Sequence, residues 1–595
     1  MTNTSYSDVW DLNSIFPGGS ESPDFHRFLD DLKGKVNIFS DMVSNGQPLK
    51  SVNESEKTAF LKYIESIKSI LVDLEEAESF ISCLEAENTS DPKAGALRNE
   101  LTSLAAEYQT SFVLFQQILS QTKEDVWAQL VQDESLKEIE FVLNEWREEA
   151  REKLSTKEEA LIEALAVDGY HGWGQMYDSM VGGMQVTVGG KTLSIGQANN
   201  LFSEPDRSLR KEAFEKLEKA WEEKEGLFAD ILNHLAGFRL NVYRKRGWES
   251  FLKEPLEGNR MSKATLDAMW KAIAKHKEPF VRYLRRKAEL LGEEKIAWYD
   301  LEAPIASAAE KRSYSEGAAF IIRHFAKFGP KLSAFAKHAL ESSWIEAEDR
   351  PGKRPGGFCT TFPKTEESRI FMTYSGTLES VATLAHELGH AFHSDVLRPL
   401  NILNRQYAMN VAETASTLAE MIVSDAALQE AETKQEKIAL LEDKVQRSVS
   451  LLMNIHARFL FETRFYEERQ KGVVSAERLN ALMEEAQQEA FGGALGVTHP
   501  HFWASKLHFY LTDVPFYNFP YTFGYLLALN IYARALEEGA EYEEKYIALL
   551  RDTAVMKVED LIKKHLGEDP TKEEFWEKGI RLCIQDVEDF LQLIE

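Results

Sequence analysis

His386 and His390 bracket Glu387 in the pentapeptide His386-Glu387-Leu388-Gly389-His390. On an α-helix a four-residue step turns by only about 40° and rises ~6 Å, so both imidazoles project from one face. Two neutral ring nitrogens in this arrangement can bind one metal ion, and the carboxylate between them can reach a water on that ion. The spacing is the HExxH pattern of zinc peptidases. It predicts a Zn²⁺ site in which Glu387 is the general base for hydrolysis of an amide bond.

A catalytic zinc ion usually has three protein ligands, so the pattern needs one more. Between residues 407 and 424 the only charged side chains are Glu413 and Glu420, seven residues apart on a predicted buried helix. Buried carboxylates need partners. We expect Glu413 to be the third ligand and Glu420 to hold a ligating imidazole through its free N–H, with buried salt bridges as the alternative. His393 lies on the same helical face as His386 and His390. Three imidazoles along one side of a helix would not surround the ion tetrahedrally, so His393 is a poor candidate for the third ligand.

Gly389 lies inside the predicted motif helix, where glycine costs about 1 kcal/mol relative to alanine. We expect a close approach at this position, either by a packed backbone or by the helix that carries Glu413. The alternative is that the helix merely tolerates a glycine at this position.

An aromatic segment follows later in the chain. Six of the ten residues from Phe516 to Tyr525 are aromatic, and His508 lies just upstream. Tyrosine hydroxyls and an imidazole can stabilise a developing oxyanion and shape a peptide pocket. An aromatic core is the alternative explanation for the same residues.

The elements that must position these residues are mostly helices. Apolar residues recur at three- and four-residue steps through residues 97–119, 212–242, 265–291 and 434–469, which predicts a mainly α-helical bundle. Residues 184–195 instead predict a β-hairpin around Gly189-Gly190. Residues 369–374 predict a short strand, after which Ser375-Gly376-Thr377 begins the motif helix. Pro399 ends that helix.

The composition limits the classes of function. The chain has 595 residues and a net charge of −28, which opposes nucleic-acid binding. It contains no apolar run long enough to cross a membrane and no N-terminal signal pattern. Three widely spaced cysteines exclude a disulfide framework and favour a reducing cytoplasm. We place a boundary near residue 200, between an N-terminal helical lobe (residues 1–200) and a catalytic domain (residues 201–595).

Three segments together resemble the oligoendopeptidase F group, relatives of thimet oligopeptidase and neurolysin. They are the run from Thr383 to His393, the run Ala412-Glu413-Thr414-Ala415-Ser416, and the stretch from His508 to Tyr525. Twenty-two residues separate His390 from Glu413, which is similar to the family spacing. The resemblance extends from about residue 110 to near the C-terminus.

The resemblance implies a two-lobed, mainly helical zincin in which a deep channel admits short oligopeptides. By position, residues 369–374 would be the edge strand that pairs the substrate backbone, so Phe371 and Met372 are expected to bind substrate.

The family's metal ligands map onto His386, His390 and Glu413, and its general base maps onto Glu387. Its oxyanion positions map onto His508 and Tyr525. The resemblance leaves open whether Tyr517 or Tyr521 acts beside Tyr525. We place Tyr517 in the catalytic set and Tyr521 among the substrate-binding residues.

Two other functions fit parts of the sequence. An exopeptidase of similar fold would need a cation that binds the terminal carboxylate of a peptide, and the sequence cannot place one in the cleft. A non-catalytic, zinc-stabilised peptide-binding protein would favour cysteine ligands and would not need Glu387. The endopeptidase is the favoured interpretation. The oligomeric state is not predicted.

Overall fold

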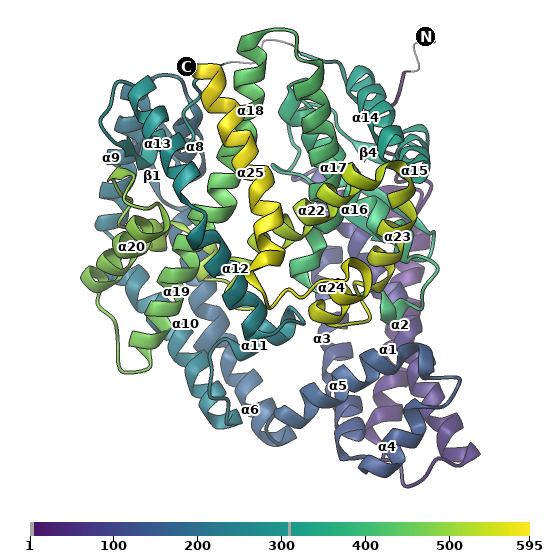
Figure 1. Ribbon diagram of the computed structural model, residues 1–595. Helices are drawn as coiled ribbons and strands as arrows, with labels where there is room; N and C mark the ends of the chain where they lie inside the picture. The colour runs from purple at the N-terminus through teal and green to yellow at the C-terminus, as the bar shows by residue number, and fades with distance from the viewer. Residues whose placement is uncertain (1–4, 307–310) are drawn as a thin grey trace.

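The computed structural model describes residues 5–306 and 311–595, which form a mainly helical molecule with three small sheets (Figure 1). The first five helices are α1 (Pro23–Ser44), α2 (Glu54–Glu87), α3 (Pro92–Gln121), α4 (Glu124–Val131) and α5 (Glu140–Glu152). Ten helices follow in the middle of the chain: α6 (Thr156–Ala166), α7 (Gly172–Gly182), α8 (Ile195–Asn200), α9 (Arg207–Glu222), α10 (Glu225–Arg246), α11 (Lys253–Gly258), α12 (Lys263–Lys275), α13 (Glu278–Leu290), α14 (Tyr314–Phe328) and α15 (Pro330–Glu341).

The C-terminal part supplies the remaining helices. They are α16 (Leu378–Leu397), α17 (Met409–Glu430), α18 (Lys434–Val449), α19 (Ile455–Arg469), α20 (Ala476–Ala490), α21 (Phe502–Ser505), α22 (Phe519–Glu538), α23 (Tyr542–Asp552), α24 (Val558–Leu566) and α25 (Glu573–Ile594). The strands are β1 (Gln185–Val188), β2 (Lys191–Ser194), β3 (Ile296–Ala297), β4 (Ile345–Glu346), β5 (Phe358–Phe362), β6 (Glu367–Phe371) and β7 (Leu495–Val497).

The predicted helical runs are confirmed, with breaks that periodicity alone did not show. Residues 97–119 lie inside α3, and residues 434–469 form α18 and α19 joined by a π-helical turn at Ser450–Asn454. Residues 212–242 divide into α9 and α10. Residues 265–291 divide into α12 and α13, where Pro279 lies in the first turn of the second helix. Proline fits a first turn but not a helix interior.

The predicted β-hairpin is also confirmed. Strands β1 and β2 pair antiparallel, with Val188 opposite Lys191. The two intervening residues, Gly189 and Gly190, have φ angles of 57° and 77°. Both angles are positive, as a type I′ turn requires, and glycine adopts them without strain.

Two hydrophobic clusters form the core. One is built from buried residues between Trp10 and Leu143, joined by Phe362 and Phe371 of the sheet and by Ile402 and Leu403. The other is built from buried residues between Ala166 and Phe590. Figure 1 shows α1, α4 and α5 gathered at the lower right, below α24. Along the chain, the N-terminal part of the first cluster ends at Leu143, and the second cluster begins at Ala166. The domain boundary near residue 200 stays a prediction.

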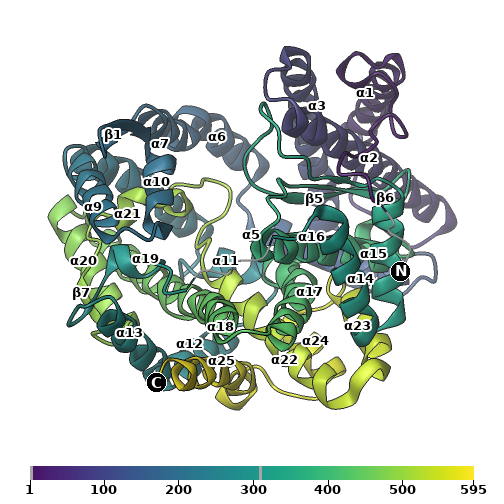
Figure 2. The same cartoon turned by 90° about the horizontal axis from the view of Figure 1, so that it is seen from above.

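The three-stranded sheet lies between the two clusters. Its order is β4-β6-β5, with β6 parallel to β4 and antiparallel to β5. Figure 2 shows α16 beside β5, with α2 beyond the sheet. Neighbouring residues of a strand face opposite sides, so Ile370 joins the second cluster and Phe371 joins the first.

This sheet corrects the prediction about the substrate-pairing strand. Residues 369–374 do include a strand, but β6 is the central strand of its sheet, so the prediction of an edge strand is wrong. Phe371 and Met372 have 0% and 2% of their surface exposed. They pack into opposite hydrophobic clusters, so neither presents a surface to a substrate here. The exposed edge belongs to β5.

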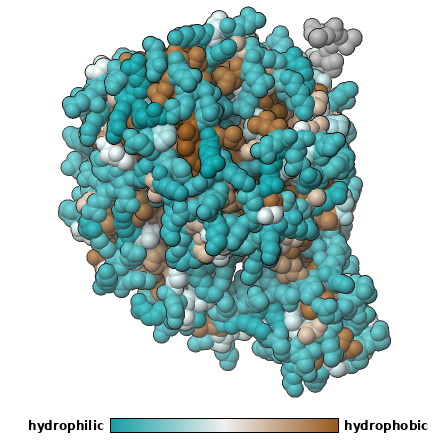
Figure 3. Space-filling model, viewed as in Figure 1, coloured by the Kyte–Doolittle hydropathy of each residue, from teal (hydrophilic) through white to brown (hydrophobic). Residues whose placement is uncertain are grey.

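The helix that carries the motif begins and ends close to the predicted positions. The Thr377 side chain accepts a hydrogen bond from the Ser380 amide at 3.2 Å and caps α16, which ends at Leu397 before Pro399. The face of the molecule shown in Figure 3 is mostly hydrophilic, with scattered hydrophobic areas. Within the described residues, no helix is long and apolar enough to cross a membrane.

Candidate metal centre

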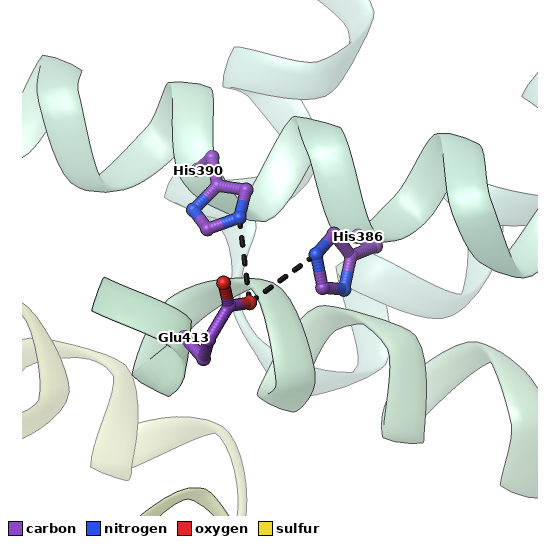
Figure 4. A group of neighbouring side chains, drawn as sticks. All are labelled: His386, His390 and Glu413. Atoms are coloured by element: carbon purple, nitrogen blue, oxygen red, sulfur yellow. Dashed lines mark ion pairs between the residues drawn. The ribbon is translucent and has the colours of Figure 1, made fainter. Parts of the chain in front are cut away.

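Three side chains from two adjacent helices converge on one point (Figure 4). His386 and His390 come from α16, and Glu413 comes from α17. The Glu413 Oε2 atom lies 3.3 Å from His386 Nε2 and 3.5 Å from His390 Nε2. All three donor atoms fall within 4.8 Å of one another. The structure thus brings the three predicted ligands together.

Two glycines allow the helices to approach this closely. A Cβ on Gly389 of α16 would lie 2.5 Å from the Ala415 carbonyl oxygen of α17. A Cβ on Gly524 of α22 would lie 2.9 Å from the Asn410 oxygen and 3.2 Å from the Glu413 Cβ. Helix α17 is therefore held between two glycine contacts, one on each side of the turn that bears Glu413. The predicted close approach at Gly389 is confirmed.

Glu420 contacts the other ring nitrogen of the first imidazole. Its Oε2 atom lies 3.3 Å from His386 Nδ1, and Arg447 of α18 forms an ion pair with the same carboxylate. A carboxylate in this position orients the imidazole and makes its free nitrogen a better metal donor. The predicted contact between Glu420 and one of the histidines is therefore present.

The charges of the cluster suit a divalent cation. Burial lowers the pKa of His386, but the carboxylates of Glu413 and Glu420 outweigh it, so this pKa rises to about 10. Burial raises the pKa of Glu413, but the two imidazoles hold it well below its usual range. Two imidazoles and an ionised carboxylate form a donor set typical of catalytic zinc, so these residues fit the ion.

Glu387 differs from the other acids of the site. It is 7% exposed, and its Oε2 atom has no hydrogen-bond partner within the described part of the chain. Burial raises the pKa of this carboxyl, while His386 and His390 lower it. A Cβ on Gly357 would lie 3.3 Å from Glu387 Oε1, so the backbone before β5 approaches this carboxylate directly.

His393 belongs to the core. It is fully buried, its Nε2 atom lies 2.9 Å from Thr553 Oγ1, and its ring stacks on Tyr407 with centroids 4.2 Å apart. These contacts place it outside the group of three donors, as the sequence predicted.

Two cavities meet at the metal centre. One, of about 790 Å³, is lined by His386, Glu413, Tyr521 and residues of α18. The other, of about 510 Å³, is lined by His386, Glu387, His390 and Glu413, by Gly357, and by the β5 residues from Phe358 to Thr361. Since both include His386 and Glu413, open space extends from the centre in two directions.

Of the predicted side chains between His508 and Tyr525, the structure brings together three: His508, Tyr517 and Tyr521. His508 stacks on Tyr517 with ring centroids 5.2 Å apart, and Tyr521 lies edge-on to Tyr517 at 5.2 Å and to His508 at 6.2 Å. Tyr521 is near enough to Glu413 that the carboxylate contributes, after burial and Tyr517, to raising the pKa of its phenol.

Tyr525 is not part of this group. It is 6% exposed, and its hydroxyl lies 2.9 Å from Ser448 Oγ and 3.5 Å from Cys583 Sγ. Its hydroxyl is thus bound between α18 and α25, although the side chain also lines the larger cavity together with His386, Glu413 and Tyr521. Its predicted oxyanion role stays a prediction. One helical turn separates Tyr521 from Tyr525, and both line the larger cavity, but of the two it is Tyr521 that contacts His508 and Tyr517.

The family resemblance places Gly356-Gly357-Phe358 in a loop near the cleft, but sequence reasoning assigned no chemical role to Gly357 or to β5. The Gly356-Gly357 pair before this strand was the available signal, because glycine often marks a close backbone approach. Its link to Glu387 depends on how the sheet packs on α16.

The fold and this centre together define a mainly helical, metal-dependent hydrolase. Comparison with known proteins supports and narrows that class. Residues 200–581 match the family described as Peptidase family M3, and residues 119–185 match the family described as Oligopeptidase F.

Relatives and solved structures agree with these matches. The chain is 23% identical to an oligoendopeptidase F homolog of Lactococcus lactis, covering 91% of this chain and 90% of that protein. It is 25% identical to the oligopeptidase PepF of Bacillus subtilis, covering 84% and 75%. A crystal structure from Chlamydophila abortus superposes with a TM-score of 0.83 at 20% identity, covering 99% of both chains. Oligoendopeptidase F from Enterococcus faecium superposes with a TM-score of 0.71 at 19% identity, covering 96% and 99%.

The chain therefore belongs to peptidase family M3. Its activity is that of a metalloendopeptidase, and the resemblance to the oligoendopeptidase F group is confirmed.

Proposed function

We propose that this protein is a zinc-dependent endopeptidase that hydrolyses internal bonds of short oligopeptides. The observation that carries the proposal is the convergence of His386, His390 and Glu413 beside a buried Glu387 whose Oε2 is unpaired in the described residues. These three donors would hold the ion. When bound, zinc supplies Lewis acidity at the scissile carbonyl and makes water a better nucleophile.

Glu387 is the proton carrier in this proposal. Its free Oε2 accepts a proton from the attacking water, and the same carboxyl then donates it to the leaving amine. Burial raises the pKa of Glu387 toward the range in which a carboxyl can both accept and release a proton. Because Gly357 has no side chain, it leaves the other carboxylate oxygen, Glu387 Oε1, uncrowded.

His508, Tyr517 and Tyr521 form the second half of the proposed machinery. Burial and the nearby cations Arg458 and Lys506 lower the pKa of His508 to about 4, so its imidazole is neutral at pH 7 and can donate one hydrogen bond. The Tyr521 phenol lines the same cavity as Glu413 and can donate to the oxyanion. Tyr517 packs against both side chains and orients them.

Strand β5 is the proposed docking edge for the peptide. Its residues line the smaller cavity beside Glu387, and none of the described strands pairs with its outer edge. A peptide in extended form can pair with such an edge through main-chain hydrogen bonds, which accept many sequences. The relatives' names describe oligopeptidases, in keeping with short peptides as substrates. A reducing cytoplasm stays the predicted compartment, and all three cysteines are free thiols.

Replacement of Glu387 by glutamine tests the mechanism. Glu387→Gln removes the proton acceptor but keeps the shape, so we expect zinc content to stay near one ion per chain while kcat falls by about 10²- to 10⁴-fold. Zinc content by elemental analysis and cleavage of an internally quenched peptide are the two measurements. Substantial residual turnover in this variant would rule out Glu387 as the base.

A peptide blocked at both ends separates the endopeptidase from an exopeptidase. An endopeptidase cuts such a peptide at internal bonds, and mass spectrometry locates them. An exopeptidase needs a free terminus and would leave the blocked peptide intact, which would contradict the proposal.

A further inference from the structure

A buried carboxyl on α19 binds the segment that leads into α22. Glu462 is 3% exposed. Its Oε1 atom accepts a hydrogen bond from the Phe516 amide at 3.3 Å, and its Oε2 atom accepts one from Asn518 Nδ2 at 2.6 Å. Phe516 and Asn518 are the two neighbours of Tyr517 in the chain. Both oxygens of this carboxyl therefore hold the residues on either side of Tyr517.

The backbone at Phe516 has an unfavourable conformation. Its φ angle is 55°, which a bulky side chain rarely adopts unless the surroundings impose it. Of the four non-glycine residues with positive φ in the described part of the chain, Phe516 is the buried one. Its ring stacks on Phe251 with centroids 5.7 Å apart, and its amide is bound by Glu462. Ring packing and this hydrogen bond together stabilise the strained turn.

Asn518 connects Glu462 to the start of α22. Its Nδ2 atom donates to Glu462, so its Oδ1 atom faces the helix, where it accepts a hydrogen bond from the Phe519 amide and caps α22. The Asn518 carbonyl oxygen also accepts a hydrogen bond from the Tyr521 amide at 3.2 Å. The contact with Glu462 thus determines how the first turn of α22, which bears Tyr521, begins.

The other end of the segment is held from the same helix. Arg239 of α10 donates a hydrogen bond to the Leu511 carbonyl oxygen at 2.6 Å and another to the Tyr466 hydroxyl at 3.1 Å. Tyr466 comes four residues after Glu462 and shares its face of α19. Residues 511–518 are therefore attached to one face of α19 at both ends, directly through Glu462 and indirectly through Arg239.

The side chains carried here form the oxyanion side of the proposed site. Tyr517 stacks on His508 with ring centroids 5.2 Å apart. Tyr521 contacts both rings and lines the larger cavity at the metal centre. A donor stabilises a developing charge only within hydrogen-bond distance, and a displacement of about 1 Å can cost about 10²-fold in rate. A shift of residues 516–518 would move Tyr517 directly and Tyr521 through the first turn of α22.

We propose that Glu462 is a positioning residue for peptide hydrolysis, which keeps Tyr517 and Tyr521 in place for the developing oxyanion. Glu462 lines neither cavity at the metal centre, so it acts through these two tyrosines and not on the substrate. Without this carboxyl, the Phe516 amide and the Asn518 side chain lose their partner, and the strained turn can relax. The inference rests on the proposed peptidase function and adds to it the group that holds its oxyanion side.

Replacement of Glu462 by glutamine is the first test. Glu462→Gln keeps the shape but offers one acceptor oxygen instead of two, and its amide nitrogen cannot accept from Asn518. We expect kcat to fall by about 10-fold or more, while KM stays within about 2-fold and zinc content is unchanged. Glu468→Gln is the matched control on α19, because Glu468 pairs with Arg478 of α20 at 2.7 Å. It should leave kcat and KM unchanged.

An exchange of the two side chains tests the contact itself. Asn518→Asp alone places two carboxyls together and should also lower kcat. In Glu462→Gln/Asn518→Asp, the introduced amide can donate to the introduced carboxylate and accept from the Phe516 amide, and the second carboxylate oxygen can still cap α22. The double variant should therefore recover most of kcat. Losses that only reflect lower stability would add up instead of cancelling.

Hydrogen exchange measured by mass spectrometry examines the wild type directly. Fragments that cover residues 516–521 should exchange slowly, although they begin outside regular structure, because their amides are bound to Glu462, to Asn518 and within the turn. In Glu462→Gln the exchange of these fragments should become faster, while fragments of α17 stay unchanged. The wild-type measurement needs neither activity nor a folded variant.

The outcomes separate this inference from the proposed function. If the wild type cleaves the peptide, an unchanged kcat in Glu462→Gln, or no recovery in the double variant, overturns the inference alone. Fast exchange of residues 516–521 in the wild type overturns it as well. If the zinc-loaded wild type cleaves no peptide, the proposed function fails and this inference fails with it.

Discussion

The residues of the centre owe their roles to small differences in position. Tyr521 and Tyr525 lie one turn apart on α22, yet Tyr521 contacts His508 and Tyr517 while the Tyr525 hydroxyl binds Ser448. A hydroxyl contributes to catalysis only when it reaches the oxygen on which charge develops. The two tyrosines are therefore expected to behave differently when each loses its hydroxyl.

Matched substitutions by phenylalanine test this difference. Tyr521→Phe should lower kcat by about 10²-fold with little change in stability, because an oxyanion donor is lost. Tyr525→Phe should instead leave kcat within a few-fold and lower the free energy of unfolding by about 1 kcal/mol, because a buried hydrogen bond is lost. Steady-state kinetics and thermal melts measure both. The assignment fails if Tyr525→Phe proves the more damaging to kcat.

At the scale of elements, close helix packing creates the metal site. Helix α16 supplies two ligands and α17 the third, and Gly389 lets the two backbones meet where a side chain would collide with Ala415. The distance between Glu413 and the imidazoles depends on this contact. A glycine that is unfavourable for the isolated helix is thus required by the assembled pair.

Gly389→Ala should separate α16 from α17. The new Cβ would lie 2.5 Å from the Ala415 oxygen, so we expect a loss of about 1–3 kcal/mol in stability and weaker zinc binding. Gly95→Ala in α3 is the control, because nothing lies within 4 Å of its added Cβ. That variant should be neutral or slightly stabilised. Equal melting temperatures and zinc affinities for the two variants would contradict the packing argument.

At the scale of the whole molecule, the free energy of unfolding is expected to depend on pH and on bound metal. Glu462 of α19 accepts hydrogen bonds from the Phe516 amide at 3.3 Å and from Asn518 Nδ2 at 2.6 Å, and so braces the segment that bears Tyr517. Burial raises the pKa of Glu462 to about 8, against the smaller opposing effect of Arg239. The folded protein therefore retains a proton that the unfolded chain releases above about pH 4.5.

This shift predicts a pH dependence with a definite sign. The contribution of protonated Glu462 to stability is fully present below about pH 4.5 and is lost as the pH rises through about 8. The slope is at most about 1.4 kcal/mol per pH unit from this group. Glu462→Gln keeps the side-chain shape but cannot ionise, so its melting temperature should fall less than that of the wild type between pH 5 and pH 8. Parallel curves for the two proteins would exclude this contribution.

Metal removal should also destabilise the molecule. Zinc that binds only the folded state stabilises it by about 4 kcal/mol when its free concentration is a thousand times the dissociation constant. A chelator should therefore lower the melting temperature and abolish peptide cleavage, and added zinc should restore both. Glu413→Gln is the matched control, because it lacks one proposed ligand and should show a much smaller shift with the chelator. An identical shift in both proteins would place the stabilising metal elsewhere.

Much of the site could be predicted from local sequence patterns. The four-residue spacing of His386 and His390 determines that both rings share a helix face, whatever the helix packs against. The two acids of an otherwise uncharged segment similarly predicted a buried helix whose carboxylates need partners, and the structure supplies those partners at His386 and His390. The hairpin at Gly189-Gly190 follows from turn chemistry alone.

Other features were decided only by the tertiary structure. The β-branched and aromatic residues of segment 369–374 predict a strand, but its neighbours β4 and β5 decide that it lies at the centre of the sheet. The packing of α22 likewise places Tyr521 against His508 and Tyr517 and ties the Tyr525 hydroxyl to Ser448. Spacing along the chain determines which side chains share one face of a helix or strand. Contacts between elements that are distant in the sequence determine which residues that face packs against.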